Sequence, residues 1–400
     1  MIIQPKIRGF ICTTAHPKGC EKAVQEQIDY VKVREPIKGP KNVLIIGAST
    51  GYGLASRIAA TYASSAKTIG VFFEKEAEDK RTATAGWYNT AAFERIAHQD
   101  GYYAKSINGD AFSQEIKERT AALIRKDLKK IDLIIYSLAS PRRTHPKTGQ
   151  THSSVLKPIG KSFTGKTVDA FRGEVKEVNI EPASQEEIDN TIAVMGGEDW
   201  QMWIDYLAKE NLLADGVITV AYSYLGPKLT YSIYKDGTIG KAKEDLKATS
   251  DKLNQALHKL NGKSIVSVNK AVVTQASAAI PVVPLYVSIL FKIMKAKNIH
   301  EGCIEQIYRL FKDYLYVNNT KLDEDGFIRI DELEMNPLVQ QEVVGLWPQI
   351  TSDNLEALTD INGYRDDFYR LFGFNMPGVD YDKDIDPVVK IESIETESRG

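Results

Sequence analysis

Residues 42–53 read Asn-Val-Leu-Ile-Ile-Gly-Ala-Ser-Thr-Gly-Tyr-Gly, and this stretch decides the fold. Val43 to Ile46 form a short apolar run without helical periodicity, which predicts a buried strand. A glycine-rich turn follows, and residues 54–60 continue as an amphipathic helix. Glycine lets the backbone approach a pyrophosphate, and a helix start supplies free N–H groups and the positive end of a dipole. The order of strand, glycine turn and helix therefore predicts a nucleotide-binding site.

The rest of the chain alternates strand-like apolar runs with amphipathic helices. Each step fits a right-handed β–α–β progression that builds a parallel sheet. The glycines have the spacing G-x-x-x-G-x-G, which indicates the short-chain dehydrogenase/reductase branch of Rossmann folds. We therefore predict an α/β fold built on a Rossmann-type doubly wound parallel sheet. Further strands are expected at residues 68–73, 102–107, 132–137, 217–225 and 264–272.

We expect a single elaborated domain over residues 1–400, because the chain shows no internal repeat and no low-complexity linker. Glycine-containing turns are expected at residues 147–149 and 171–173, and at Asp325-Gly326 between two short strands. The expected parts are a cofactor core at about 40–140 and 215–280, an extended substrate-binding insertion at about 141–210, a helical C-terminal part at about 284–378 and a polar tail at 379–400.

The composition is that of a globular enzyme without a nucleic-acid or membrane partner. The 51 basic and 53 acidic residues nearly cancel, so no basic footprint for nucleic acid is expected. The first residues do not begin a signal peptide, and no apolar run reaches the ~20 residues of a membrane helix. Three cysteines make no disulfide framework, which favours a reducing, cytoplasmic location. Cys12, His16 and Cys20 lack the fourth ligand of a closed zinc site, so no metal is expected.

Residues at the ends of the predicted strands indicate how a dinucleotide is held. In a Rossmann unit an acidic residue after the second strand binds the adenosine ribose hydroxyls, and Glu74 occupies this place. Its carboxylate would repel a 2′-phosphate, so NADH is favoured, and the basic residues that follow it leave NADPH as the alternative. Asp110-Ala111 are expected near the adenine edge, where Asp110 is also a candidate helix N-cap. Ser137 to Ser140 are expected beside the nicotinamide ribose.

The segment after the predicted fifth strand carries three candidate catalytic pairs. Short-chain reductases use a phenol that hydrogen-bonds the substrate oxygen, and an ammonium that binds the ribose and lowers the pKa of the phenol from about 10. Tyr231 and Lys235 have the i, i+4 spacing of ketone and alcohol enzymes, which places them on one helical face. Tyr234 pairs with Lys241 at the spacing of common enoyl reductases, or with Lys243 two residues further on. Spacing alone leaves the choice open.

Motifs spread over most of the chain then match one known family. They are Arg8-Gly9-Phe10-Ile11-Cys12, Ala15-His16-Pro17, Gly47-Ala48-Ser49-Thr50-Gly51-Tyr52-Gly53, Gly86-Trp87-Tyr88-Asn89, Gly109-Asp110-Ala111-Phe112, Tyr136-Ser137-Leu138-Ala139-Ser140-Pro141-Arg142-Arg143, Met195-Gly196-Gly197-Glu198-Asp199-Trp200, Ile233-Tyr234 and Gly240-Lys241-Ala242-Lys243. With them the chain closely resembles the FabV-type enoyl-acyl-carrier-protein reductases and the related bacterial trans-2-enoyl-CoA reductases. Such a density of motifs is far more specific than a single glycine pattern.

The resemblance implies an activity and assigns residues to it. It selects Tyr234 as the catalytic acid and Lys243 as the catalytic residue that holds the cofactor ribose, with Tyr224 against the substrate thioester. The implied reaction is reduction of the trans-2 double bond of enoyl thioesters in fatty-acid biosynthesis, with NADH and without metal or flavin. The implied cofactor contacts are Gly47, Ala48, Ser49, Thr50, Gly51, Tyr52, Phe73, Glu74, Asp110, Ala111, Leu138, Ala139, Lys243, Val272, Val273 and Thr274.

Several points stay open at this stage. The acyl carrier is either acyl carrier protein or coenzyme A, because both present the same phosphopantetheine arm. The apolar stretch from Ile280 to Phe291 is expected to hold the acyl group, and the resemblance implies a monomer. The alternatives are a ketone or alcohol dehydrogenase that uses Tyr231 and Lys235, and a non-catalytic NADH-binding sensor.

Overall fold

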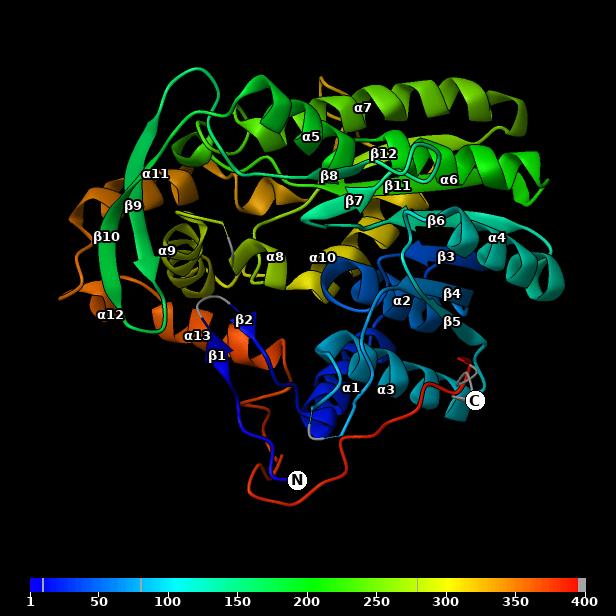
Figure 1. Cartoon of the computed structure of the whole chain (residues 1–400), viewed down its shortest axis with the longest axis horizontal. Helices are drawn as coiled ribbons and strands as arrows, with labels where there is room; N and C mark the ends of the chain where they lie inside the picture. The colour runs from blue at the N-terminus through cyan, green and yellow to red at the C-terminus, as the bar shows by residue number, and fades with distance from the viewer. Residues whose placement is uncertain (9–10, 80, 279, 395–400) are drawn as a thin grey trace.

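The computed structural model describes residues 1–8, 11–79, 81–278 and 280–394. Its centre is a seven-stranded parallel sheet (Figure 1). The predicted Rossmann-type doubly wound sheet is confirmed, whereas Gly9, Phe10 and residues 395–400 of the predicted tail lie outside the described residues. In spatial order the strands are β13 (Ile328–Arg329), β12 (Lys263–Val268), β11 (Leu213–Ser223), β6 (Ile131–Tyr136), β3 (Asn42–Ile46), β4 (Lys67–Phe72) and β5 (Ala104–Asn108).

Alternate side chains of the strands face two layers of helices, one on each face of the sheet. In β3, Val43 and Ile45 pack with the first layer, and Leu44 and Ile46 pack with the second. Because both faces are buried, the strands are continuous apolar runs, which is why the sequence pattern identified them. The first layer holds α1 (Pro17–Lys32), α2 (Gly51–Ser64), α3 (Ala85–Gln99) and α10 (Cys303–Leu310), and the second holds α4 (Gln114–Leu123), α6 (Glu198–Lys209) and α7 (Thr238–Leu257).

The insertion after β6 contains two β-hairpins that the sequence analysis did not predict. The first pairs β7 (Arg142–Thr144) with β8 (Thr151–Ser153), and the second pairs β9 (Phe163–Asp169) with β10 (Glu174–Ile180). The predicted turns are confirmed, since Gly149 and Gly173 lie between the paired strands with φ of +73°. The helix α5 (Gln185–Met195) follows, with Ser184 as its N-cap.

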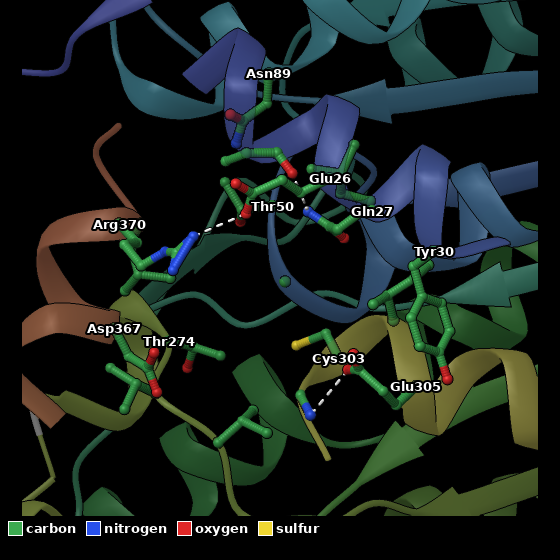
Figure 2. A pocket seen from close by; sticks show the side chains of 18 of the residues that line it. Glu26, Gln27, Tyr30, Thr50, Asn89, Thr274, Cys303, Glu305, Asp367 and Arg370 are labelled. Atoms are coloured by element: carbon green, nitrogen blue, oxygen red, sulfur yellow. Dashed lines mark hydrogen bonds and ion pairs between the residues drawn. The ribbon is translucent and has the colours of Figure 1, made fainter. Parts of the chain in front are cut away.

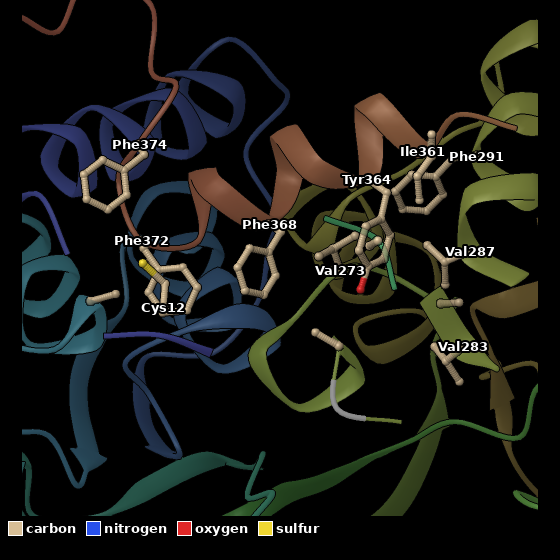
Figure 3. Close-up of a cluster of buried hydrophobic side chains, with 14 of the residues drawn as sticks. Cys12, Val273, Val283, Val287, Phe291, Ile361, Tyr364, Phe368, Phe372 and Phe374 are labelled. Atoms are coloured by element: carbon tan, nitrogen blue, oxygen red, sulfur yellow. The ribbon is translucent and has the colours of Figure 1, made fainter. Parts of the chain in front are cut away.

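The helical C-terminal part packs on the second hairpin and encloses a further apolar core (Figure 3). Phe291 on α9 (Val283–Ala296) and Phe368 on α13 (Ile361–Arg370) both contribute to it. The expected pair of short strands around Asp325-Gly326 is wrong, because residues 328–329 instead form β13, which pairs with β12 in the main sheet. The turn itself is present, with Gly326 at φ +79°.

Shorter elements complete the described residues. They are β1 (Ile7–Arg8), β2 (Ile11–Cys12), α8 (Gln275–Ala278), α11 (Pro337–Leu346), α12 (Leu355–Leu358), π-helical turns at Ile124–Leu128 and Phe311–Leu315, and 3₁₀ turns at Lys228–Thr230, His258–Leu260, Asp331–Leu333 and Trp347–Gln349.

The predicted polar tail packs against the fold over residues 379–394. Trp87 Nε1 donates to the carbonyl oxygen of Val389, and the Tyr88 hydroxyl donates to that of Pro387, both at 2.7 Å. The segment therefore lies along α3 rather than apart from the domain (Figure 1). Among the described residues, no helix combines the length and the apolar character needed to cross a membrane.

Candidate active site

The candidate site lies at the carboxyl ends of the parallel strands. In spatial order, β3 lies between β4 and β6, so the chain leaves neighbouring strands in opposite directions at this point. In open α/β sheets ligands bind in the crevice at such a switch point. Most of the predicted cofactor segments begin here, because they follow β3, β4, β5 or β6, whereas the segment from Val272 to Thr274 follows β12 and Lys243 lies on α7.

The glycine loop after β3 is held close to its neighbours by backbone contacts. Gly47 has φ of +89°, and a Cβ at this position would lie 2.1 Å from the Ser137 carbonyl oxygen at the end of β6. A Cβ on Gly53 would lie 1.8 Å from the Gly47 carbonyl oxygen. The N-cap residue of α2, Thr50, makes no side-chain hydrogen bond to the helix. The first N–H groups of α2 are therefore open to an anion, and this geometry fits a pyrophosphate.

Glu74, the residue predicted to bind the adenosine ribose, lies beside the glycine loop. Ser49 Oγ donates to Glu74 Oε1 at 2.7 Å. Asn108 at the end of β5 fixes the Glu74 backbone, accepting from its N–H at 2.9 Å and donating to its carbonyl oxygen at 3.0 Å. Burial raises the pKa of the Glu74 carboxyl above its usual range. Phe73 is 76% exposed and is available to cover a flat ring such as adenine.

Asp110 does not cap the following helix. Ser113 is the N-cap of α4 and accepts from the Ile116 N–H at 3.2 Å, whereas Asp110 Oδ1 accepts from the Phe112 N–H at 3.0 Å. The N-cap alternative for Asp110 is therefore wrong, because its carboxylate instead closes the turn that carries Ala111. This turn lies at the carboxyl end of β5.

Two buried residues that the sequence analysis missed form hydrogen bonds to the turn that carries Ala111. The Lys117 ammonium donates to the carbonyl oxygen of Ala111 at 3.0 Å and forms an ion pair with Asp199 at 2.8 Å. The Trp203 Nε1 also donates to the Ala111 carbonyl oxygen, at 3.1 Å. In the sequence Lys117 is one of several charged residues on a helix, so only the three-dimensional contacts distinguish it.

A cavity of about 460 Å³ brings the glycine loop together with the segment after β12. Thr50 lies on one wall and Thr274 on another (Figure 2). Arg370 on α13 and Glu26 on α1 form an ion pair of 2.7 Å at the same cavity. The predicted contacts Gly51, Val272 and Val273 also line this cavity, and Leu138 and Ala139 follow β6 outside its lining.

The Tyr52 hydroxyl forms hydrogen bonds within the fold. It donates to the carbonyl oxygen of Lys270 at 2.6 Å and lies 3.0 Å from Gln306 Oε1. The Lys270 N–H donates to the same Gln306 oxygen at 2.8 Å. Tyr52 thus connects the glycine loop to the segment that leads to Val272.

The three candidate catalytic pairs differ clearly in their surroundings. Tyr231 and Lys235 share no helix, because α7 begins only at Thr238, and the Lys235 ammonium lies 4.7 Å from the Tyr231 ring centre on the exposed side. Lys241 is exposed and forms an ion pair with a glutamate on its own helix at 2.8 Å. Tyr234 is only 9% exposed, and Lys243 is mostly buried.

Burial sets the protonation of the Tyr234 and Lys243 side chains. It raises the pKa of the Tyr234 phenol well above its usual value and lowers the pKa of the Lys243 ammonium to about 8. The Tyr224 ring packs edge-to-face on the Tyr234 ring, with 5.0 Å between the ring centres. The structure therefore brings together the two tyrosines that the sequence analysis assigned to substrate and catalysis.

The doubly wound sheet, the glycine loop, the carboxylate after β4 and the buried tyrosine define the class of protein as a Rossmann-type oxidoreductase. Comparison with protein families narrows this class. The trans-2-enoyl-CoA reductase catalytic region matches residues 81–316, and the NAD(P)H binding domain of trans-2-enoyl-CoA reductase matches residues 2–79. An enoyl reductase FAD binding domain matches residues 322–385, where FAD is part of the name of the domain. The chain therefore belongs to the trans-2-enoyl-CoA reductase family, as its motifs indicated.

Individual relatives cover almost the whole chain. A trans-2-enoyl-CoA reductase [NADH] from Ruminiclostridium cellulolyticum is 60% identical over 98% of this chain and all of the relative. An enoyl-[acyl-carrier-protein] reductase [NADH] from Flavobacterium johnsoniae is also 60% identical, with the same coverage. The crystal structure of the Treponema denticola trans-2-enoyl-CoA reductase in complex with NAD superposes with a TM-score of 0.94 at 51% identity, covering 98% of this chain and all of that one. These relatives do not favour a ketone dehydrogenase or a silent sensor.

Proposed function

We propose that this chain catalyses the NADH-dependent reduction of the trans-2 double bond of enoyl thioesters to the saturated acyl thioester. Relatives of the same length that are named as NADH-dependent enoyl reductases support the proposal. The observation that carries it is the burial at the site. Of the three candidate pairs, Tyr234 and Lys243 are the pair in which neither side chain is exposed.

The residues at the strand ends would hold the dinucleotide. The glycine loop from Gly47 to Tyr52 and the open first turn of α2 would bind the pyrophosphate. Glu74 would accept hydrogen bonds from the adenosine ribose, next to Phe73, and the turn at Asp110-Ala111 would border the adenine. Leu138-Ala139 and Val272 to Thr274 would enclose the nicotinamide half. When bound, NADH supplies the hydride that is added to the β-carbon of the substrate.

Tyr234 would donate a hydrogen bond to the thioester oxygen. Addition of hydride to the β-carbon moves negative charge onto this oxygen, which becomes an enolate. The oxygen is much more basic in the transition state than in the substrate, so the hydrogen bond lowers the barrier rather than merely improving binding. Because burial raises the pKa of the phenol, Tyr234 is still protonated when the enolate forms. Protonation of the enolate at the α-carbon would then give the saturated thioester.

Lys243 would bind the ribose of the nicotinamide half with its ammonium group. The same charge stabilises the enolate and the Tyr234 phenolate as the proton moves. Lys243 lies in the second turn of α7, the helix that directly follows the turn carrying Tyr234.

The acyl chain would enter an apolar cavity of about 280 Å³ on the substrate side. The hairpin of β9 and β10 forms one wall, and α13 forms another through Tyr364 and Phe368. Ile280, Pro281 and Pro284, from the stretch predicted to hold the acyl group, complete the lining. Such a cavity accepts a hydrocarbon chain without specific polar contacts.

The biological setting proposed here is the last reductive step of fatty-acid elongation, in the cytoplasm and with the enzyme as a monomer. The carrier is either acyl carrier protein or coenzyme A, since the proposed site would recognise the thioester and acyl chain that both share. Light scattering of the purified chain tests the oligomeric state.

The decisive experiment follows the loss of NADH absorbance with crotonyl-CoA and with a longer enoyl chain on acyl carrier protein, using NADPH as the control reductant. Oxidation of NADH with either thioester supports the proposed reaction. The ratio of the two kcat/KM values then identifies the preferred carrier. Tight NADH binding without oxidation on either thioester would contradict the proposal and favour the sensor.

A further inference from the structure

Glu334 is a completely buried carboxyl group that contacts Tyr224, the ring neighbour of the proposed catalytic tyrosine. It follows the 3₁₀ turn after β13, and no motif in the sequence singled it out. Its Oε1 atom accepts from the hydroxyls of Tyr224 and Tyr286, at 3.1 Å and 2.6 Å. Its Oε2 atom accepts from the backbone N–H of Ala271 at 2.6 Å. Three donors from three different elements therefore converge on one carboxylate.

The charges around Glu334 keep this arrangement together. The buried Lys270 ammonium donates to the Ala271 carbonyl oxygen at 2.7 Å, next to the N–H that Glu334 binds. Asp331, on the same turn as Glu334, is neutralised by Arg329 at 2.6 Å. The titratable groups that face Glu334 are thus the two tyrosines, Lys270 and Asp331. A carboxylate that accepts from three donors is stable in the interior only while all three are in place.

The donors reach different parts of the proposed active site. Tyr224 packs edge-to-face on Tyr234. Ala271 directly precedes the segment from Val272 to Thr274, which lines the cavity at the glycine loop. Glu334 therefore connects the neighbour of the catalytic phenol to the segment proposed to enclose the nicotinamide.

We propose that Glu334 is a positioning residue for the reduction: it holds the Tyr224 hydroxyl, and through the Tyr224 ring it orients the Tyr234 phenol. This inference rests on the proposed function. It also assigns Tyr224 a definite part. Because the hydroxyl proton of Tyr224 is donated to Glu334, Tyr224 offers the substrate its ring and an oxygen lone pair, and Tyr234 supplies the proton.

The test combines Glu334→Gln with Tyr224→Phe in a double-mutant cycle. A glutamine keeps the volume but replaces one acceptor oxygen by an NH₂ group, so either the Ala271 N–H or the two tyrosine hydroxyls lose their acceptor. We expect kcat with crotonyl-CoA to fall at least about tenfold, with a much smaller change in KM, because misplacing a catalytic group affects the transition state most. In the Tyr224→Phe background the same substitution should have only a small further effect.

The control variant is Glu332→Gln, two residues away on an exposed side chain, which should keep wild-type kcat. Effects of Glu334→Gln and Tyr224→Phe that simply multiply would overturn the proposal, as would an unchanged kcat in Glu334→Gln.

If Glu334→Gln does not fold, Tyr224→Phe and Tyr286→Phe are compared, because each removes one donor from the same oxygen. A larger loss of kcat in Tyr224→Phe supports positioning, and equal losses contradict it. A wild-type enzyme without turnover would instead refute the proposed function itself.

Discussion

Burial of the Tyr234 side chain favours the protonated phenol that the proposed reaction needs. The phenol is removed from water and stays protonated, so it acts as a donor rather than as a base. We expect Tyr234→Phe to reduce kcat roughly 10²–10³-fold, the usual loss when one oxyanion donor is removed. NADH affinity should survive, because phenylalanine fills the same space. Steady-state turnover and an NADH fluorescence titration measure the two quantities. A greater loss in Tyr231→Phe would instead favour the ketone dehydrogenase pair.

At Lys243 the same burial predicts a pH dependence. The pKa of the ammonium is lowered to about 8, so the group is charged below this pH and loses its proton above it. Because the charged form is needed, kcat/KM should fall on the alkaline side with an apparent pKa near this value. In Lys243→Arg the guanidinium stays charged, so the remaining activity should lose this alkaline limb. Burial lowers the pKa of Lys270 to the same value, and a limb that persists in Lys243→Arg would assign it to Lys270.

At the scale of elements, six of the seven parallel strands were predictable, because most of them are short apolar runs buried on both faces. The hairpin of β9 and β10 was not, because its strands are largely half-exposed and carry charged residues between the apolar ones. The two-residue strand β13 owes its existence to pairing with β12 rather than to its own sequence.

At the candidate site, too, features that depend on neighbouring residues in the sequence were predicted, and features that depend on long-range contacts were missed. The glycine loop and Glu74 were predictable, because strand ends are local features of the sequence. The choice between Lys241 and Lys243 depends on the residue at which α7 begins and on which side of the helix is buried. The spacing of the residues in the sequence gives neither of these. Lys117 and Glu334 were missed because each has a decisive partner far away in the chain: Asp199 is 82 residues from Lys117, and Tyr224 is 110 residues from Glu334.

The contact between α7 and the turn before it leads to a prediction about Gly240. A Cβ at this position would lie 1.6 Å from the Lys235 carbonyl oxygen and 2.9 Å from that of Tyr234. Displacing backbone atoms costs more energy than rotating a side chain. Gly240→Ala should therefore push the first turn of α7 away from Tyr234. We expect a destabilisation of about 1–3 kcal/mol and at least a tenfold loss of kcat, measured by thermal unfolding and turnover.

The matched control for Gly240→Ala is Gly345→Ala in α11, where a Cβ would meet nothing within 4 Å. Alanine favours a helix by about 1 kcal/mol over glycine, so this variant should be as stable as the wild type or more so. Wild-type kcat in Gly240→Ala would show that the helix start does not position Tyr234.

At the scale of the whole molecule, the N-terminus contacts the C-terminal segment. The N-terminal amine forms an ion pair with Asp384 at 2.7 Å. Further along the C-terminal segment, Ser393 Oγ donates to the buried Glu94 at 2.7 Å. Glu94 faces the buried Arg57, which in turn donates to Ser106 on β5 at 2.8 Å. The segment after Gly378 thus connects to the buried polar network at β4 and β5.

This connection makes the C-terminal segment part of the fold, and two of its own side chains test that statement. Ile391 is 2% exposed, whereas Val388, three residues earlier, is 58% exposed. Ile391→Ala leaves a cavity against α3 and should lower the free energy of unfolding by about 2–4 kcal/mol. Val388→Ala removes a side chain that is already in water and should change it by less than about 0.5 kcal/mol. Thermal and urea denaturation of the two variants measure the difference. Equal stability of both variants would mean that the C-terminal segment lies on the surface without stabilising the fold. The contacts from Ser393 through Glu94 to Arg57 would then not stabilise the part of the chain that contains the glycine loop.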